Sequence, residues 1–389
     1  TLTSTYALDN TSSAARYALV NNTPLTVKNG TFAAGEARAI GGYAKLTLNG
    51  ATVTQTLTGG HACVAFCADG ATYTVNKESV IKGAYSVSIF ANNATVNISN
   101  STLEGTGNTL YHNGNNYGLK LTVKNTTITS SGSCGVYISG STSAQANTEN
   151  QNGAGGYQKA SFTGCTISGA TNGIEVKYTD LTLGGCTVSS TATGEPGYNQ
   201  DNNGPAASGF AVVSTDNAMN NVTPKPEGTI TITGNGNYTG SVGLGALESV
   251  KTNYEGFKDE TIKVSGGTFS SAVLPEYCAD GFVPTQNEDG TYGVKVDTSV
   301  AEVNGTKYES LADAIAAAEN GQTVKLLANV TLDAPVKVPA GKTVTLDLNG
   351  KTLSTSENAQ DKTKHYYAID NYGTFTLRDS SAAQTGEIR

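Results

Sequence analysis

Apolar and polar positions along this chain recur in one eight-residue pattern. The pattern first reads LTVKNGTF at residues 25–32, and it returns as LTLNGATV (46–53), LTVKNTTI (121–128), LTLGGCTV (181–188) and LDLNGKTL (346–353). The first, third and eighth positions are apolar, and the second and seventh are polar in most copies. Such alternation predicts a short strand, and Asn or Gly at the centre predicts a tight turn into a second short strand.

Copies of this octet follow one another with a drifting period in the low twenties. The seventh position reads Thr31, Thr52, Ser79, Thr102, Thr127, Thr166, Thr187 and Thr268. A third apolar strand follows many copies, as ARAI, SVSIF, CGVYI, NGIEV, GFAVV and SVGLG. Three strands per repeat are typical of a solenoid whose coils stack by parallel pairing. The sequence therefore predicts an all-β fold, a right-handed parallel β-helix of roughly nine coils about 4.8 Å apart.

Residues 263–296 close this regular part of the chain. Apolar pairs on either side of Asp289 and Gly290 predict a β-hairpin, because this dipeptide is a hairpin-turn signal. We expect the hairpin, at about residues 275–296, to form a lid that protects the open edge of the last coil. The first domain is thus predicted to span residues 1–296, followed by a linker at 297–307.

A second domain is predicted at residues 308–389. Residues 308–321 repeat apolar side chains at helical spacing, and Ser310 lies at capping-box spacing before Asp313. Gly at the end of this segment is expected to terminate the helix. Strand patterns and a further octet come after it. The sequence therefore predicts a short α-helix that caps the start of a second, incomplete β-helix.

Composition narrows the classes of partner. Only 14% of the residues are charged, the net charge is −8 and no basic cluster is present, which argues against nucleic acid as a partner. No apolar run is long enough to predict a membrane span. The three histidines and six cysteines lack the spacing of metal ligands, so neither a metal nor another cofactor is expected.

Four cysteines are candidates for disulfide bonds. Cys165 and Cys186 hold the same octet position one coil apart. We favour two small apolar residues in a buried column, because a buried free cysteine behaves as a small hydrophobic residue. A disulfide between coils is the alternative, and an exported protein would permit it. Cys63 and Cys67 are close enough in sequence to form a bridge as well.

No catalytic signature accompanies the repeat. The candidate carboxylates for hydrolysis of a glycosidic bond are Glu175, Asp180, Asp201, Asp216, Glu248 and Glu255. The spacing pairs none of them as this chemistry requires, and Lys177 is the only base close to any of them. Strand alternation is expected to point Glu175 outward. We expect a non-catalytic protein, and the alternative is a polysaccharide lyase or glycoside hydrolase on the same scaffold.

Aromatic residues in long loops are candidates for ligand binding. Insertions at 139–159, 214–228 and 248–260 are expected along one edge of the predicted β-helix. A further insertion, at 190–208, is expected at a different corner of the coil. Their aromatic side chains are Tyr157, Tyr254 and Phe257, with Tyr198 at the second corner. Such rings can stack on sugars of a glycan or a host surface. The alternative is that they only pack onto the rod.

Two passages carry a resemblance to a known group of proteins. The helix followed by VTLDLNGKTL, and the closing unit GGTFSSAV…YCADGFVPTQNEDGTYGV, resemble repetitive surface proteins of gut-dwelling anaerobic bacteria, within the pectin-lyase-like β-helix group. The resemblance covers both regions and most of the chain. It implies an extracellular protein, secreted or displayed at the cell surface, with an adhesin-like or structural role.

The two ends of the chain predict self-association. Residues 1–32 open directly into coil sequence, and residues 340–389 continue a coil without a closing hairpin. We expect these two edges to pair between copies, which gives a homo-oligomer that is either a ring or a filament. The alternative is that the chain is a piece of a longer repeat protein, and the two interpretations are compatible.

Overall fold

The computed structural model describes residues 2–4, 17–35, 38–56, 61–112, 114, 116–139, 158–198, 204–215, 228–245, 262–356 and 367–389. The chain divides into two compact units, Thr1–Val296 and Asp297–Arg389. In the described part of the chain, no helix has the length and apolar character needed to span a membrane.

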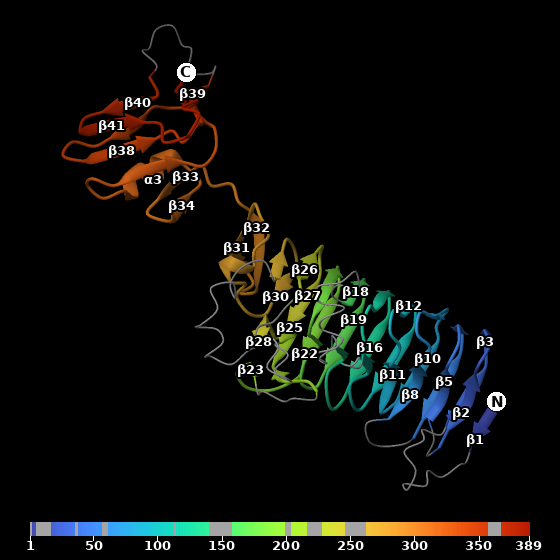
Figure 1. Ribbon diagram of the computed structural model, residues 1–389. Coiled ribbons are helices and arrows are strands. Elements are labelled where there is room, and N and C mark those ends of the chain that lie inside the picture. Colours follow the sequence, from blue (N-terminus) through green and yellow to red (C-terminus); the bar gives the residue numbers. More distant parts are fainter. Residues whose placement is uncertain are drawn as a thin grey trace. The chain divides into compact units, whose positions relative to one another are not determined.

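Three sheets of stacked strands build the first unit (Figure 1). Sheet A runs in the order β1 (Leu2–Ser4), β4 (Thr31–Ala34), β7 (Thr52–Gln55), β10 (Val80–Gly83), β13 (Thr102–Gly105), β16 (Thr127–Ser130), β19 (Thr166–Gly169), β22 (Thr187–Ser190), β27 (Asn237–Thr239), β30 (Thr268–Phe269), β32 (Tyr292–Val296) and β31 (Phe282–Gln286). Sheet B runs in the order β2 (Tyr17–Asn21), β5 (Arg38–Gly42), β8 (Ala62–Phe66), β11 (Tyr85–Ile89), β14 (Leu110–His112), β17 (Val136–Ile138), β20 (Ile174–Val176), β25 (Phe210–Thr215) and β28 (Ser241–Gly245). Sheet C runs in the order β3 (Leu25–Lys28), β6 (Leu46–Asn49), β9 (Thr72–Asn76), β12 (Thr95–Ser99), β15 (Lys120–Lys124), β18 (Gln158–Thr163), β21 (Thr179–Gly184), β26 (Ile230–Thr233) and β29 (Ile262–Val264).

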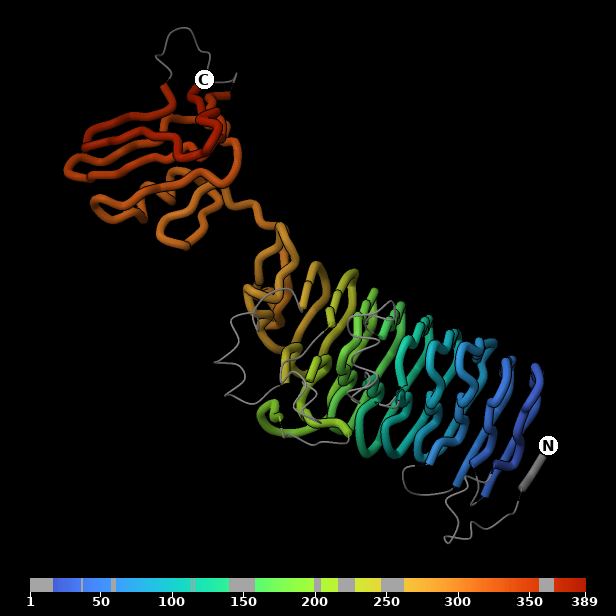
Figure 2. Tube along the Cα trace, in the orientation of Figure 1, coloured from blue at the N-terminus to red at the C-terminus, as the bar shows by residue number. Residues whose placement is uncertain are grey.

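The chain visits the sheets in the order C, A, B, so each turn of the solenoid contributes one strand to each sheet. Figure 2 follows successive coils from the blue first coil onward. Apart from the closing hairpin, pairing within the sheets is parallel, as in Leu46 with Tyr73 and Val136 with Ile174. The prediction of a parallel β-helix is confirmed.

The threonines of the octet lie in register, with one exception. Thr31 pairs with Thr52, and Thr102 pairs with Thr127. Between them, Val80 and not Ser79 pairs with both neighbouring coils, so our alignment of that copy was wrong by one residue.

The reason for this shift is a longer turn. Asn49 and Asn76 are in register, but three residues separate Asn76 from Val80, whereas two separate Asn49 from Thr52. Lys77 and Glu78 take left-handed backbone angles there, with φ of 53° and 61°. Ser79 turns inward instead, where its Oγ donates to the Asn76 carbonyl at 2.6 Å.

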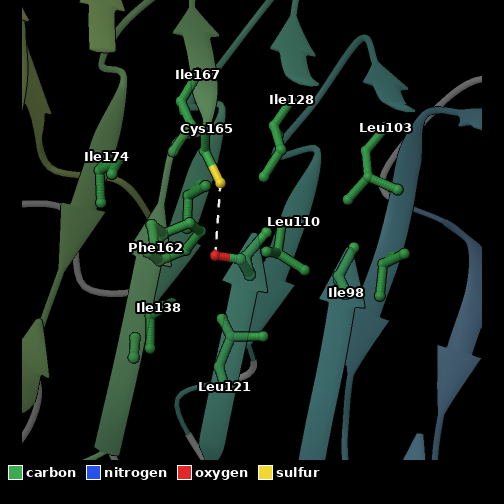
Figure 3. Packing of buried hydrophobic residues seen from close by; sticks show 14 of the residues in the cluster. Ile98, Leu103, Leu110, Leu121, Ile128, Ile138, Phe162, Cys165, Ile167 and Ile174 are labelled. Atoms are coloured by element: carbon green, nitrogen blue, oxygen red, sulfur yellow. Dashed lines mark hydrogen bonds between the residues drawn. The ribbon is translucent and has the colours of Figure 1, made fainter. Parts of the chain in front are cut away.

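Apolar columns from the three sheets meet inside the coils. Along sheet A, Ile81, Leu103, Ile128 and Ile167 are fully buried. Figure 3 shows Leu103, Ile128 and Ile167 beside side chains of the other two sheets, such as Leu110 and Leu121. Each such side chain contributes about 1.5–3 kcal/mol when fully buried. Stacking of coils therefore supplies the core that a single coil lacks.

Turns between sheets C and A use left-handed residues, as the octet predicts. Asn29 has a φ of 49° and Gly50 has a φ of 66°. At Gly50 this left-handed backbone conformation favours glycine, since a residue with a Cβ is strained there.

The closing hairpin forms from β31 and β32. These strands pair with each other antiparallel, and Tyr292 of β32 pairs with Phe269 of the last parallel strand of sheet A. Phe269 in turn stacks on Tyr238 of the preceding coil, with ring centroids 4.8 Å apart. The hairpin therefore continues the edge of sheet A, as predicted.

The second unit starts another parallel coil. One sheet runs in the order β34 (Thr306–Tyr308), β33 (Ala301–Val303), β35 (Thr323–Leu326), β38 (Thr343–Asp347) and β41 (Thr374–Arg378). The others are β36 (Val330–Leu332), β39 (Thr352–Thr355) and β42 (Glu387–Ile388), and β37 (Val336–Val338) with β40 (Ile369–Asn371). Helix α3 (Leu311–Ala317) packs against this core through Leu311, Ala314 and Ile315. Its cap is the predicted one, since the Asp313 N–H donates to Ser310 Oγ at 3.0 Å, but the helix ends before Gly321.

The predicted linker at 297–307 is wrong. β33 and β34 form a hairpin in this segment, and β33 also pairs antiparallel with β35, so that Ala301 and Val303 are buried. Asn304 and Gly305 have φ of 52° and 83°, which is the signature of a two-residue hairpin turn. Asn-Gly is a strong hairpin signal, so the hairpin was predictable from Asn304 and Gly305. The linker interpretation overlooked this signal.

Candidate functional site

A row of tyrosines lies on the outer face of sheet B. Tyr111 and Tyr137 are in register on adjacent coils, and their rings are 5.8 Å apart and nearly parallel. Tyr85 lies 5.3 Å from Tyr111 on its other side, and Phe90 approaches Tyr111 edge-on at 6.1 Å. We call Tyr85, Tyr111 and Tyr137 the tyrosine row. The rings of Tyr85 and Tyr111 are half-exposed, and Tyr137 is buried.

Strand alternation positions Tyr111 and Tyr137, whereas Tyr85 begins β11 and lies out of register with them, since Ser88 is the residue opposite Tyr111. In β14, Leu110 and His112 point inward, so Tyr111 between them points outward. Burial raises the pKa of both Tyr85 and Tyr111, so these phenols are neutral at ordinary pH. Gly107 lies against Tyr85, because a Cβ there would come within 2.1 Å of the ring. Tyr85 and Tyr111 therefore present uncharged ring surface on a rigid sheet, and Tyr137 supports them from beneath the cover of residues 204–209.

Glu175 follows Tyr137 in the same outward column. The two residues are paired in register, so the side chain points away from the core, as the sequence predicted. It is nevertheless fully buried. Its Oε1 accepts hydrogen bonds from the Ala206 N–H at 2.7 Å and from Thr215 Oγ1 at 3.1 Å. Its Oε2 accepts from Asn172 Nδ2 at 2.9 Å and from the Ala207 N–H at 3.3 Å.

A segment that returns over sheet B covers this carboxylate. We call residues 204–209 the cover segment. Its Gly204 carbonyl accepts hydrogen bonds from the Tyr137 hydroxyl and from Lys177 Nζ, both at 3.0 Å. Asn172 Nδ2 also donates to the Ala207 carbonyl at 2.6 Å. Side chains of the sheet thus hold the cover segment at several points.

The electrostatics of Glu175 follow from this burial. Loss of solvent raises the pKa of its carboxyl group, and the nearby Lys177 ammonium opposes that shift. The adjacent Cys134 thiol is also buried, and burial together with the Glu175 charge raises its pKa. The donors around Glu175 satisfy both oxygens, so this carboxylate anchors structure and has no free face toward a sugar.

Of the other residues considered for catalysis, only Asp180 and Lys177 are described. Asp180 lies on the outer face of sheet C, where its Oδ1 accepts from Thr229 N and Thr229 Oγ1 at 3.2 and 3.1 Å. It is therefore not brought together with Glu175. Those that lie outside the described residues are Asp201, Asp216, Glu248 and Glu255.

The predicted loop aromatics are mostly outside the described residues. This holds for Tyr157, Tyr254 and Phe257. Tyr198 ends β23 (Gly197–Tyr198), which pairs antiparallel with β24 (Ala207–Ser208), and its side chain is half-buried. A Cβ at Gly245 of β28 would lie 3.1 Å from its ring, so Tyr198 packs close to sheet B. The tyrosine row was missed, although tyrosine at the middle of β14 and β17 was a readable signal.

All six cysteines are free thiols in the structure. Cys165 and Cys186 are buried in adjacent coils, and a hydrogen bond between the two thiols lowers the pKa of Cys186 and raises that of Cys165. Cys63 is buried, whereas Cys67 is half-buried with its Sγ 3.9 Å from the Tyr17 hydroxyl. The candidate disulfides stay predictions. In the part of the chain that the structure describes, no three His, Cys, Asp or Glu side chains cluster as metal ligands would.

A groove of about 570 Å³ crosses four coils beside the ends of the sheet A strands. Its lining includes Gln55, Lys82, Glu104, Thr106 and Thr129. Lys82 and Glu104 are in register and form an ion pair at 2.8 Å, so they neutralise each other across the groove.

Comparison of the chain with family models, with curated proteins and with solved structures found no match. The functional argument therefore depends on the residues themselves.

Proposed function

We propose that this protein is a non-catalytic extracellular protein, structural or adhesin-like, that contacts glycans through the tyrosine row. The observation that carries the proposal is the row itself, in which aromatic rings repeat on successive coils of one rigid sheet. Ligand sites are commonly lined by aromatic side chains, and tyrosine offers contact area at little entropic cost. The resemblance to surface proteins of gut anaerobes supports the same role and location.

The state of Glu175 supports a non-catalytic role. Cleavage of a glycosidic bond requires two carboxyl groups with access to the sugar. Glu175 is fully buried, and its oxygens accept four hydrogen bonds from nitrogen and hydroxyl donors.

A carbohydrate-active enzyme is the second candidate. One observation favours it, because Glu175, Lys177 and Tyr137 lie together beneath the cover segment. This candidate requires the cover segment to leave the sheet before a substrate can reach the carboxylate.

Self-association belongs to the same proposal. Leu377 of β41 continues the buried column of Leu346 in register, yet it is 46% exposed. We propose that residues 340–389 of one copy pair with residues 1–32 of another. Light scattering after size exclusion tests this step, and a monodisperse monomer at micromolar concentration would contradict it.

A glycan array tests the main proposal. We expect wild-type protein to bind a subset of glycans and Tyr111→Ala to lose that binding. Tyr43→Ala is the matched control, because Tyr43 is exposed but lies outside the row. Equal binding by wild type and Tyr111→Ala would refute the proposed surface. In a parallel assay, release of saccharide fragments by wild type but not by Glu175→Gln would favour the enzyme.

A further inference from the structure

A second groove lies on the outer face of sheet C, away from the tyrosine row. It has a volume of about 490 Å³, and the polar side chains that line it include Lys120, Thr122, Lys159, Ser161, Asp180 and Thr182. These residues come from the adjacent strands β15, β18 and β21. The volume falls within the range of small-molecule sites.

Two like charges stand directly opposite each other in this groove. Lys120 pairs in register with Lys159, and both side chains are exposed. Like charges at directly opposed positions destabilise a sheet. Among the described residues, neither lysine has a carboxylate at ion-pair distance. The position therefore costs stability in the free protein, and no ion pair among the described residues offsets that cost.

The neighbouring carboxylate of Asp180 forms no ion pair with either lysine. Asp180 is the next residue of the same column, in register with Lys159. Its Oδ1 is engaged by both the N–H and the hydroxyl of Thr229. The groove on sheet A provides the contrast, because there Lys82 faces Glu104 in register and the two form an ion pair.

Hydroxyl groups run beside the two lysines. Thr122, Ser161 and Thr182 occupy one register position on three successive coils. Each hydroxyl both donates and accepts hydrogen bonds. The groove thus combines paired ammonium groups, a row of hydroxyls and one carboxylate, which complements a ligand that carries an anion and several hydroxyls of its own.

We propose that this groove binds an acidic saccharide unit, with Lys120 and Lys159 on its carboxylate or sulfate and the hydroxyl row on its own hydroxyls. The ligand anion then takes the place of the missing carboxylate between the lysines. This site lies on a different sheet from the tyrosine row, so a negative result for one site does not affect the proposal for the other.

Titration calorimetry with defined tetrasaccharides tests the proposal. The probes are hyaluronan tetrasaccharide for the carboxylate, chondroitin sulfate tetrasaccharide for the sulfate, chitotetraose as a neutral counterpart, and sodium sulfate as the free anion. We expect an acidic tetrasaccharide to bind and the neutral one not to bind. Lys159→Gln and Lys120→Gln should each weaken binding about tenfold or more, as loss of a charge-assisted hydrogen bond predicts. Binding should also weaken as salt is added.

Lys124→Gln is the matched control. Lys124 lies on the same outward face of β15, about 13 Å from Lys120 along the strand, so its loss removes the same charge without touching the groove. It should bind like wild type, and so should Tyr111→Ala. In the absence of ligand, Lys120→Gln should have an unfolding temperature equal to or above that of wild type, because it removes the repulsion and leaves Lys159 opposite Asp180.

Three results would overturn the proposal. They are equal affinity for the neutral and acidic tetrasaccharides, unchanged affinity in both groove variants, and binding of sulfate alone with no tetrasaccharide bound.

Discussion

Acid should destabilise the first unit through one buried histidine. His112 of β14 points into the apolar core between Ile89 and Ile138, with which it is in register. Its side chain is fully buried, and its Nδ1 lies 2.6 Å from the Ser139 carbonyl oxygen. Nδ1 therefore carries the proton and donates it. Nε2 is buried and has no hydrogen-bond partner among the described residues, so a second proton there would place a charge in an apolar surrounding.

The size of the effect follows from the pKa of this imidazole. Burial lowers the pKa of His112 from 6.5 to about 4, and the hydrogen bond to Ser139 opposes the shift only in part. Between pH 6.5 and pH 4, the His112 imidazole therefore binds a second proton in the unfolded chain but stays neutral in the folded chain. The free energy of unfolding falls as the pH drops through this window, and the full loss is about 3 kcal/mol below pH 4. Between pH 7 and pH 4.5 the expected loss is about 2 kcal/mol.

Urea unfolding near pH 7 and near pH 4.5 measures this contribution. Other groups titrate over the same range, so the quantity of interest is the pH-dependent loss in wild type minus that in His112→Leu. We expect the variant to lose about 2 kcal/mol less than wild type. Ile138→Val is the control, because it opens a small cavity beside His112 without removing a titratable group and should lower stability equally at both pH values. An identical pH-dependent loss in wild type and His112→Leu would refute the reasoning.

Three further predictions concern stability and redox state. Glu175→Gln should destabilise the protein by about 1–3 kcal/mol in urea unfolding, because the amide NH₂ would face hydrogen-bond donors that now point at a carboxylate oxygen; unchanged stability would contradict the four-donor geometry. Gly50→Ala should cost about 1–3 kcal/mol, since its φ of 66° lies in the left-handed region; Gly30→Ala is the control, because its φ is not left-handed and the new Cβ would make only ordinary van der Waals contacts, and equal losses would contradict the argument. Mild oxidation should join Cys165 to Cys186, because adjacent coils place their Cα atoms within disulfide range. Intact mass and thiol labelling of the unfolded protein measure this bond, and Cys165 and Cys186 thiols that still react with the label after oxidation would contradict it.

Much of the architecture was readable from the sequence because its causes are local. Alternation of apolar and polar residues within each octet determined which side chains face the core. Asn and Gly at the turns determined where each strand ends, and Ser310 with Asp313 determined where helix α3 begins. Even the hairpin at Asn304 and Gly305, which we interpreted as a linker, is predicted by this two-residue turn signal.

Only the tertiary structure decided which outward side chains are accessible and what stands beside them. One extra turn residue moved Val80 into the place expected for Ser79, since the register of a strand depends on the length of the turn that leads into it. Glu175 faces outward as its strand predicts, but residues some thirty positions later in the chain fold over it and bind its oxygens. Lys120 and Lys159 are far apart in sequence and become direct neighbours through the stacking of coils. The sequence by itself thus determined the coil and its core, because these depend on neighbours along the chain. The surfaces that carry function depend on neighbours across coils, and only the assembled solenoid brings those together.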